Sequence, residues 1–239
     1  MLLQIEIERR MSPEHKPYTL TLKYETENKS ETVAAMLQSI NSNSRRQDAE
    51  GKSFEPVRWE CSCLQKKCGA CAMVINGRPM LACDAKLLEA AKRGRIAIGP
   101  LKKFPPVADL IVDRGPMLAA LSEAKLWLTE QGLVKAENTD LAFEASRCLQ
   151  CGCCLEVCPN FYAGGSFMGM AAAMPGSRLL LAAGETDKAA LAAEYKKHVY
   201  GGCGKSLACR SICPAGIDIE ALLVNSNAAA VWKRPWRKK

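Results

Sequence analysis

The stretch RCLQCGCCLEVCPN, residues 147–160, holds five cysteines within the eleven positions from Cys148 to Cys158. Four of them follow the spacing C-x2-C-x2-C-x3-C, and Pro159 comes directly after the last one. Cys153 falls outside this spacing. Cysteines that are spaced in this way and end on Cys-Pro are typical of a ligand run for a metal cluster. Four of the five are therefore predicted to share a ligand role that Cys153 does not have.

The composition indicates a globular protein with unusually many cysteines. Of 239 residues, 48% are hydrophobic and 24% are charged, and the length allows two modest domains. The 13 cysteines are odd in number, so they cannot all pair within the chain. We expect no secretory leader and a reducing compartment, where clustered cysteines bind metals rather than form disulfides. The net charge of +8 suggests an acidic partner, such as nucleic acid, anionic lipid or an acidic protein face.

No apolar run reaches the roughly 18–20 residues that span a bilayer. The most apolar stretch, 167–183, is interrupted by Pro175 and Arg178. We therefore expect no membrane-spanning helix in this chain.

The first hundred residues show the patterns of a small α+β domain. Apolar and polar residues alternate at 3–8 and 18–24, which predicts two half-buried strands. Apolar residues then recur at helical spacing between 33 and 40. Ser30 or Thr32 is placed to cap the start of this helix.

A hairpin is predicted around Asn76-Gly77. These two residues tolerate the positive φ angles of a type I′ turn, and apolar runs at 72–75 and 79–82 flank them. A last short strand is expected at 96–98.

The segment GPLKKFPP, residues 99–106, is the predicted linker, because its prolines and lysines resist both helix and sheet. Beyond it, Pro116 opens a helical pattern that closes near Gly132. Three alanine-rich stretches favour further helices, at 171–174, 189–193 and 219–230. The fold class is therefore predicted to be α+β, with a mixed domain over 1–104 and an all-α domain over 105–239.

Four cysteines of the first domain have the spacing of a plant-type 2Fe–2S ferredoxin loop: Cys63, Cys68, Cys71 and Cys83. A short loop with Gly69 can turn its backbone N–H groups toward the cluster, and the predicted hairpin returns Cys83 to that loop. A zinc ribbon would instead show two C-x2-C pairs. Cys61 is left over.

The cysteine run at 148–158 has the spacing of bacterial ferredoxins, in which the fourth cysteine binds the other cluster of a pair. A partner run is present as Cys203, Cys209 and Cys213-Pro214. By this crossing rule, the ligands of a 4Fe–4S cluster are Cys148, Cys151, Cys154 and Cys213. The second cluster then takes Cys158, Cys203 and Cys209. Ser206 stands where the fourth thiolate would be, so a 3Fe–4S cluster is favoured there. Cys153 is expected to be a buried small hydrophobe.

These three ligand sets, in this order, resemble the iron–sulfur subunits of succinate dehydrogenase and fumarate reductase, the complex II family. The resemblance covers nearly the whole chain. Two further stretches agree with it: CGACAMVINGRPMLAC at 68–83 resembles the first cluster loop, and PLKKFPPVADLIVDRG at 100–115 resembles the interdomain segment. The resemblance implies a β-grasp ferredoxin domain followed by a helical ferredoxin domain.

The resemblance also implies partners and a place. A flavoprotein subunit would carry covalent FAD and the dicarboxylate site, and a transmembrane anchor would hold quinone and often haem. Electrons would pass between FAD and quinone through the 2Fe–2S, 4Fe–4S and 3Fe–4S clusters in turn. The chain would lie peripherally on the cytoplasmic face of the cell membrane. It shows no G-x-G-x-x-G motif and no nucleophile–base pair, so we predict no catalytic residue in it.

One departure from the family concerns the quinone. Ubiquinone enzymes carry a tryptophan shortly after the first Cys-Pro, whereas this chain has Tyr162 and Ala163 there. This favours menaquinone as the quinone. The sequence of this subunit is compatible with either direction, succinate oxidation or fumarate reduction. The terminal VWKRPWRKK, residues 231–239, suits either a membrane interface or a solvated end.

Several alternatives stay open at this stage. GGCGKS at 201–206 resembles the end of a phosphate-binding loop, but Val199 occupies the position of its first glycine. His198 is expected on a helix surface. Four nearby cations either stabilise reduced clusters or are simply solvated: Lys66, Lys67, Lys205 and Arg210. The rival functions are a thiol-linked fumarate reductase or heterodisulfide-type electron carrier, and a nucleic-acid protein with a structural cluster; we predict no nucleic-acid partner.

Overall fold

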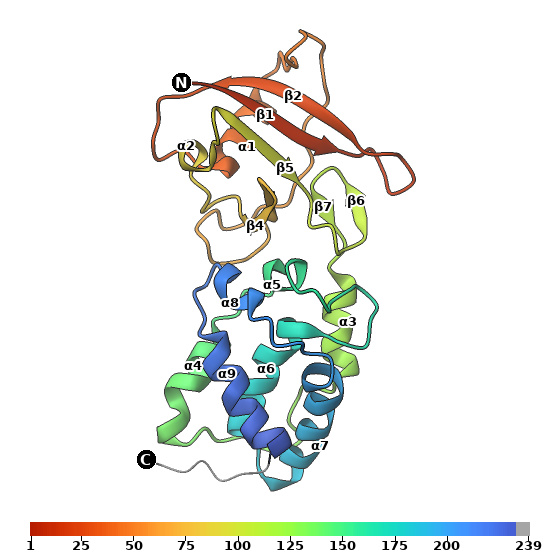
Figure 1. Ribbon diagram of the computed structural model, residues 1–239, viewed down its shortest axis with the longest axis vertical. Helices are drawn as coiled ribbons and strands as arrows, with labels where there is room; N and C mark the ends of the chain where they lie inside the picture. The colour runs from red at the N-terminus through yellow and green to blue at the C-terminus, as the bar shows by residue number, and fades with distance from the viewer. Residues whose placement is uncertain (233–239) are drawn as a thin grey trace. The chain divides into compact units, whose positions relative to one another are not determined.

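The computed structural model describes residues 1–232, and within it the chain forms two compact units (Figure 1). The first unit is Met1–Asp113, and the second begins at Arg114. The final residues 233–239, which hold most of the basic terminal segment, lie outside the described residues.

The first unit is built on a five-stranded mixed sheet. Its strands are β1 (Leu2–Arg9), β2 (Tyr18–Glu25), β3 (Ala72–Ile75), β4 (Arg78–Leu81) and β5 (Arg95–Gly99). Their order in the sheet is β2-β1-β5-β3-β4. The pair β1–β5 is parallel and the other three pairs are antiparallel. All five strands were predicted from alternation or from the hairpin signal.

The core of this unit lies on one face of the sheet. Leu3, Ile5 and Ile7 alternate along β1 and are fully buried, as period-2 patterning requires. Helix α1 (Val33–Ser42) buries its first turns, and the short helix α2 (Leu87–Ala90) follows the hairpin. Of the two predicted caps of α1, Thr32 is the one used, because its Oγ1 accepts a 3.1 Å hydrogen bond from the Ala35 amide.

The predicted turn between β3 and β4 is confirmed. Asn76 and Gly77 both have positive φ angles, 49° and 77°, as a type I′ turn demands. The Asn76 side chain also accepts a hydrogen bond from the Ala97 amide of β5. The turn therefore sets the hairpin register and joins it to the neighbouring strand.

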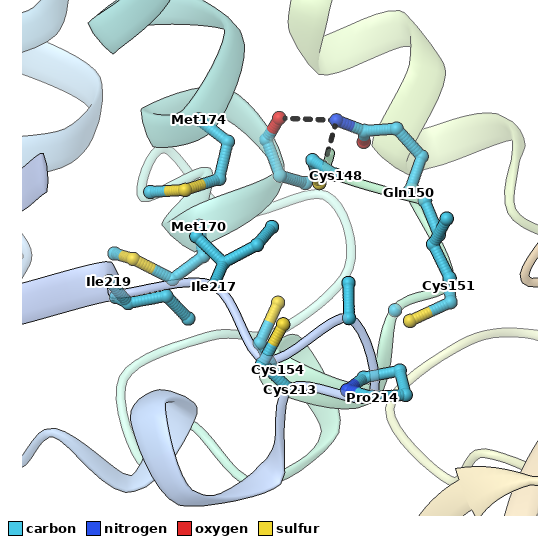
Figure 2. Close-up of a pocket in the computed structure, with 14 residues that line it drawn as sticks. Cys148, Gln150, Cys151, Cys154, Met170, Met174, Cys213, Pro214, Ile217 and Ile219 are labelled. Carbon is cyan, nitrogen blue, oxygen red and sulfur yellow. Dashed lines mark hydrogen bonds between the residues drawn. The ribbon is translucent and has the colours of Figure 1, made fainter. Parts of the chain in front are cut away.

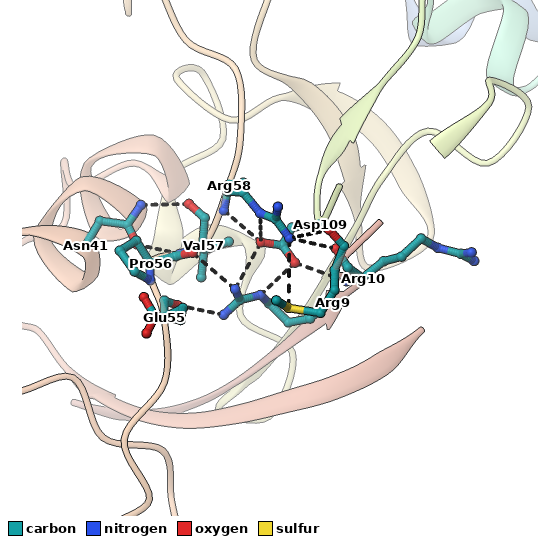
Figure 3. Close-up of polar contacts among 9 residues, drawn as sticks. Arg9, Arg10, Asn41, Glu55, Pro56, Val57, Arg58 and Asp109 are labelled. Atoms are coloured by element: carbon teal, nitrogen blue, oxygen red, sulfur yellow. Dashed lines mark hydrogen bonds and ion pairs between the residues drawn. The ribbon is translucent and has the colours of Figure 1, made fainter. Parts of the chain in front are cut away.

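The segment after the predicted linker is a small hairpin, β6 (Pro106–Ala108) and β7 (Ile111–Val112), that belongs to the first unit. Its turn residue Asp109 has a fully buried side chain, whose polar contacts are drawn in Figure 3. The carboxylate forms an ion pair with the buried Arg9 and accepts hydrogen bonds from the backbone amides of Arg10 and Arg58. These contacts tie the hairpin to β1, so the compact unit continues past residue 104, the predicted boundary, to Asp113.

The second unit is helical throughout its described residues. Its α-helices are α3 (Gly115–Glu123), α4 (Thr139–Ser146), α5 (Cys153–Glu156), α6 (Gly169–Ala182), α7 (Glu185–Tyr195), α8 (Ala208–Ile212) and α9 (Ile219–Asn227). A 3-10 turn covers Ala136–Asn138, and π-helical turns cover Lys196–Tyr200 and Ala228–Trp232. The three alanine-rich stretches lie in α6, in α7 and from α9 into the last π-turn, as predicted.

The helix predicted from Pro116 to Gly132 is shorter than expected. It ends at Glu123, and Lys125 has a left-handed φ of 50° that an α-helix does not accept. Leu126 and Leu128 still pack against the apolar core of the unit. Their burial explains why the apolar spacing continued in the sequence after the helix had ended.

Helix α6 runs through the middle of the second unit and is buried along most of its length (Figure 1). Its Ser177 donates to the Ala173 carbonyl and accepts from Ser226 of α9. None of the helices within residues 1–232 is long and apolar enough to cross a membrane.

Candidate functional site

The β3–β4 hairpin brings two of the predicted ligand cysteines together. Cys71 directly precedes β3, Cys83 follows β4, and the strands pair Ala72 with Leu81. The Ala82 amide donates to the Cys71 carbonyl at 3.0 Å, which continues the ladder to the ends of the strands. The Cys83 thiol lies close enough to the Cys71 thiol to contribute to its raised pKa.

The loop before the hairpin turns backbone amides toward sulfur. Gln65 and Lys67 both donate their backbone N–H groups to the Cys63 sulfur at 3.3 Å. The Lys66 amide donates to the Cys83 sulfur, also at 3.3 Å. Lys66 reaches this position through a left-handed φ of 60°. A loop with its donors turned inward stabilises negative charge on the thiolates that it surrounds.

The pKa values of these thiols follow from the same contacts. The backbone amides of Gln65 and then Lys67 lower the pKa of Cys63 to about 7. Burial raises the pKa of Cys71 to about 12, and the neighbouring Cys83 adds to the increase. Iron binds the deprotonated form, so binding a cluster would release the proton of Cys71. The Lys66 Nζ atom lies 2.7 Å from the Asp84 Oδ2 atom, so this lysine has a carboxylate partner beside the loop. Cys61 is exposed.

The second unit gathers four cysteines around one pocket: Cys148, Cys151, Cys154 and Cys213 (Figure 2). The rest of the lining is mainly apolar and includes Met170, Met174, Ile217 and Ile219. Gly152, with a φ of 86°, turns the chain from the first two cysteines into α5. Cys213 ends α8 and comes from the other cysteine run.

A second pocket of this unit holds the remaining predicted ligands, Cys158, Cys203 and Cys209. Ser206 lines the same pocket, together with Phe167, Leu207 and Leu223. Asn160 donates to the Gly202 carbonyl at 2.6 Å and so joins the two cysteine runs beside it. The Met170 side chain lines both pockets, so the two sites are close neighbours.

Burial acts against the charged form of two of the thiols around the first pocket. Burial raises the pKa of Cys148 to about 11, although the backbone N–H of Gln150 opposes the increase, and burial raises the pKa of Cys154 well above its ordinary value. Burial also raises the pKa of Cys209 in the second pocket. Cys151 is the exception, since the Cys153 thiol donates to it and lowers its pKa to about 7. Buried neutral thiols with few competing partners suit a cation that displaces their protons.

The spacing of the sulfurs favours a cluster over a single ion. Within residues 1–232, no group of three or more His, Cys, Asp or Glu side chains is close enough to hold one metal ion. A zinc ion needs four ligands at about 2.3 Å from one centre. In an iron–sulfur cluster the cysteines are shared among several irons, one cysteine per iron in a three-iron or four-iron cluster and two per iron in a two-iron cluster, so the sulfurs do not converge on one centre. The all-cysteine donor sets and apolar linings therefore fit clusters.

Other residues singled out in the sequence have clear surroundings. Cys153 is fully buried and lines neither pocket. Arg210 forms an ion pair with Glu220, and Lys205 lies 5.2 Å from the centre of the Tyr200 ring. The surface position expected for His198 is wrong, because the residue is only 1% exposed. Its Nδ1 lies 3.0 Å from the Ser166 carbonyl oxygen and its Nε2 lies 3.2 Å from a Glu194 oxygen.

Two residues of these surroundings were missed. Asp109 anchors the hairpin of the first unit, and Gln150 places a polar side chain at the first pocket of the second. Gln150 carried a signal, since an amide between two predicted ligand cysteines is out of place in an apolar pocket. Asp109 carried none that distinguishes it from a surface turn residue.

Comparison with known proteins agrees with the two units. A model described as a 2Fe-2S iron-sulfur cluster binding domain matches residues 4–119, and a 4Fe-4S dicluster domain matches residues 144–217. The succinate dehydrogenase iron–sulfur subunit of Bacillus subtilis is 36% identical over 191 residues, which cover 75% of this chain and 74% of that protein. The chain belongs to the family of iron–sulfur subunits of succinate dehydrogenase and fumarate reductase.

Two more matches extend the comparison. The fumarate reductase iron–sulfur subunit of Wolinella succinogenes is 28% identical over 183 residues, covering 71% of this chain and 76% of that protein. A chain of the Mycobacterium smegmatis Sdh1 complex in the apo form shares the fold, with a TM-score of 0.71, 20% identity and 99% coverage of both chains. The relatives thus include subunits of both succinate dehydrogenase and fumarate reductase.

Membership of this family confirms several predictions. The fold class is α+β, and the chain is an electron-transfer subunit of an oxidoreductase complex. It has the domains that bind 2Fe–2S and 4Fe–4S clusters, and its family also binds a 3Fe–4S cluster. Complex II subunits work in membrane-associated assemblies.

Proposed function

We propose that the chain relays single electrons between the FAD of a flavoprotein subunit and a quinone held by a transmembrane anchor. The observation that supports this most strongly is the grouping of eleven cysteines around one loop and two neighbouring pockets. Each cluster, when bound, takes up and gives back one electron without breaking a bond. The chain contributes the thiolates, the apolar walls that keep water out and the backbone amides that face sulfur.

The proposed ligand sets follow the crossing rule. The 2Fe–2S cluster is held by Cys63, Cys68, Cys71 and Cys83. The 4Fe–4S cluster is held by Cys148, Cys151, Cys154 and Cys213, and the 3Fe–4S cluster by Cys158, Cys203 and Cys209. The lining of the two pockets supports this division, because Cys213 lies with the first run and Cys158 with the second.

The three-iron assignment depends on Ser206. Its side chain lines the second pocket, where the corresponding residue of the first run is Cys151. A serine hydroxyl holds its proton far more tightly than a thiol and is a poor iron ligand beside thiolates. The site therefore offers three strong ligands, which suits a cluster of three irons.

The proposed partners are the FAD subunit, which would carry the dicarboxylate site, and a quinone-binding anchor, with or without haem. The chain would lie peripherally on the cytoplasmic face of the cell membrane. Tyr162 is 66% exposed and follows Cys158 by four positions in the sequence, in the region where ubiquinone enzymes carry a quinone-contacting tryptophan that this chain lacks. This supports menaquinone as the acceptor or donor.

Anaerobic purification through a tag on this chain tests the proposal. We expect a flavoprotein and a multi-helix membrane protein to co-purify. Succinate added to the oxidised complex should then produce the EPR signals of reduced clusters, and fumarate should reverse them. A complex whose clusters respond to a dithiol–disulfide pair and to neither dicarboxylate would instead support the rival heterodisulfide-type carrier.

A further inference from the structure

The Gln150 side chain makes an unusual contact at the first pocket of the second unit. Its Nε2 donates to the Cys148 sulfur at 3.6 Å and to the carbonyl oxygen of Ala171 at 3.0 Å (Figure 2). Gln150 stands between Cys148 and Cys151 in the sequence, and its left-handed φ of 50° belongs to the turn between them. The other non-cysteine side chains labelled around the pocket are apolar.

The partner of Gln150 on helix α6 is available because of a proline. In a regular helix, the Ala171 carbonyl would accept the amide hydrogen of residue 175. Residue 175 is Pro175, which lies inside α6 and has no amide hydrogen. The Ala171 carbonyl therefore lacks its helical donor, and the Gln150 amide supplies one in its place.

This anchor also fixes which way the amide faces. A carbonyl oxygen only accepts, so Nε2 rather than Oε1 must face Ala171. Rotating the amide by half a turn would bring Oε1 against the carbonyl oxygen and the sulfur, which are both acceptors. The Gln150 Oε1 atom itself is buried and has no hydrogen-bond partner within residues 1–232. The hydrogen bond from Nε2 to the Cys148 sulfur is therefore present even though this orientation leaves the buried Oε1 atom without a donor.

A donor on a ligand sulfur acts on the electron affinity of the cluster. Reduction adds one electron and makes no new bond, so the extra negative charge spreads over the irons and their thiolates. An N–H group directed at a thiolate stabilises this charge more in the reduced state than in the oxidised state, and hydrogen bonds to sulfur are among the factors that set cluster potentials.

We propose that Gln150, anchored on the carbonyl that Pro175 leaves free, raises the reduction potential of the four-iron cluster through its hydrogen bond to Cys148. This inference rests on the proposed ligand set of that cluster. Gln150 is a positioning residue in this role, because it acts on the cluster through Cys148. In the relay, it makes the middle cluster a better electron acceptor than its thiolates and apolar pocket alone would.

The test replaces Gln150 by methionine, which keeps the length of the side chain and removes the donor. In the whole complex, the midpoint potentials are measured by EPR redox titration. We expect the ratio of reduced to oxidised four-iron cluster at a fixed potential to fall about tenfold, which corresponds to about 59 mV for a one-electron couple. The three-iron cluster in the same Gln150→Met sample should keep its potential and serves as the internal control.

Two further variants separate this effect from a general loss of packing. Pro175→Ala restores an amide donor to the Ala171 carbonyl without changing Gln150, so it should release the anchor and lower the four-iron potential in the same direction. Ser177→Ala removes a hydrogen bond elsewhere on α6 and should leave that potential unchanged.

The outcomes are distinguishable. An unchanged four-iron potential in Gln150→Met and in Pro175→Ala, or an equal shift of both clusters, would overturn the inference alone. If Gln150→Met fails to assemble, Pro175→Ala decides by itself. A parent chain without a four-iron cluster would overturn the proposed ligand set and the inference together.

Discussion

Cys148 and Cys213 line the same pocket, although four α-helices separate them in the chain. Cys158, which is much nearer to Cys148 in the sequence, lines the other pocket with Cys203 and Cys209. The first run therefore contributes three cysteines to one pocket and its last cysteine, Cys158, to the other. The second run contributes two cysteines to that other pocket and its last cysteine, Cys213, to the first. This exchange ties the start of the second unit to its end through the two proposed clusters.

Replacing Cys213 by serine tests the exchange. We expect loss or conversion of the four-iron cluster, because its fourth thiolate is removed, while the three-iron cluster remains. Low-temperature EPR of the oxidised and reduced complex distinguishes the two. Cys209→Ser is the matched variant from the same short helix and should have the opposite selectivity. Loss of the three-iron signal in Cys213→Ser, with an intact four-iron signal, would contradict the crossed ligand sets.

The two cysteines left outside the ligand sets should be dispensable for the clusters. Cys61 is exposed, so Cys61→Ser should change neither cluster content nor stability. Cys153 is fully buried and donates to Cys151, so Cys153→Ser should lower stability by about 1 kcal/mol and keep all clusters. Iron analysis and thermal unfolding of the two variants check this. Loss of iron in either one would show that the ligand sets are incomplete.

Ser206→Cys should convert the second pocket. The variant restores C-x2-C-x2-C at 203, 206 and 209, so four thiolates would face the cluster and a fourth iron should be held. The potential should fall, because an added anionic ligand disfavours reduction. The oxidised three-iron EPR signal is the readout, and Ser211→Cys, on the nearby helix α8 but outside the lining of the pocket, is the control. A three-iron signal of full intensity in Ser206→Cys would mean that position 206 does not face the cluster.

Asp109→Asn should destabilise the first unit by about 3 kcal/mol, because it leaves the buried Arg9 cation without its carboxylate. Glu8→Gln, which removes a half-buried carboxylate oxygen 3.8 Å from the exposed Lys102 Nζ, should cost less than about 0.5 kcal/mol. Hydrogen exchange of the β1 amides measures both. Equal protection in parent and Asp109→Asn would contradict the anchoring role.

The pH dependence of this effect has a definite sign. Burial acts to raise the pKa of Asp109, but hydrogen bonds from Arg9, Arg58 and Arg10 outweigh it, so the pKa is lowered. A lowered pKa means that the stabilisation is complete above the unfolded value of about 4 and is lost as the pH falls through the folded value. The difference between parent and Asp109→Asn should therefore be the same at pH 7 and pH 5 and should shrink only below about pH 4.

The sequence allowed the strands, the first helix and the hairpin of the first unit to be predicted because each depends on local patterning. Leu3, Ile5 and Ile7 alternate with polar residues along β1. Asn76 and Gly77 form the hairpin turn because both adopt positive φ angles without help from distant residues. The hairpin at 106–112 was not predicted, because its stability comes from Asp109 and a distant arginine on β1. Pro105 and Pro106, at the start of this hairpin, also favoured the prediction of a linker over that of a strand.

The cysteine groups were predictable for a different reason. Ligand spacing reflects the geometry of a cluster, which is the same in every chain that holds one. The contact of Gln150 was not predictable from the sequence. It requires the Ala171 carbonyl, which has no helical donor because residue 175 is a proline, and only the fold brings α6 next to Gln150. The burial of His198 was likewise missed, because the Ser166 carbonyl and Glu194 that surround it are contributed by a loop and by the preceding helix.

The central claim is that one chain holds three clusters of different size, and iron analysis with EPR of the anaerobically purified protein tests it most directly. The ligand sets predict about nine iron atoms per chain, an oxidised three-iron signal, and two further signals on reduction from the two-iron and four-iron clusters. About four irons per chain, or no three-iron signal in the oxidised protein, would contradict the account.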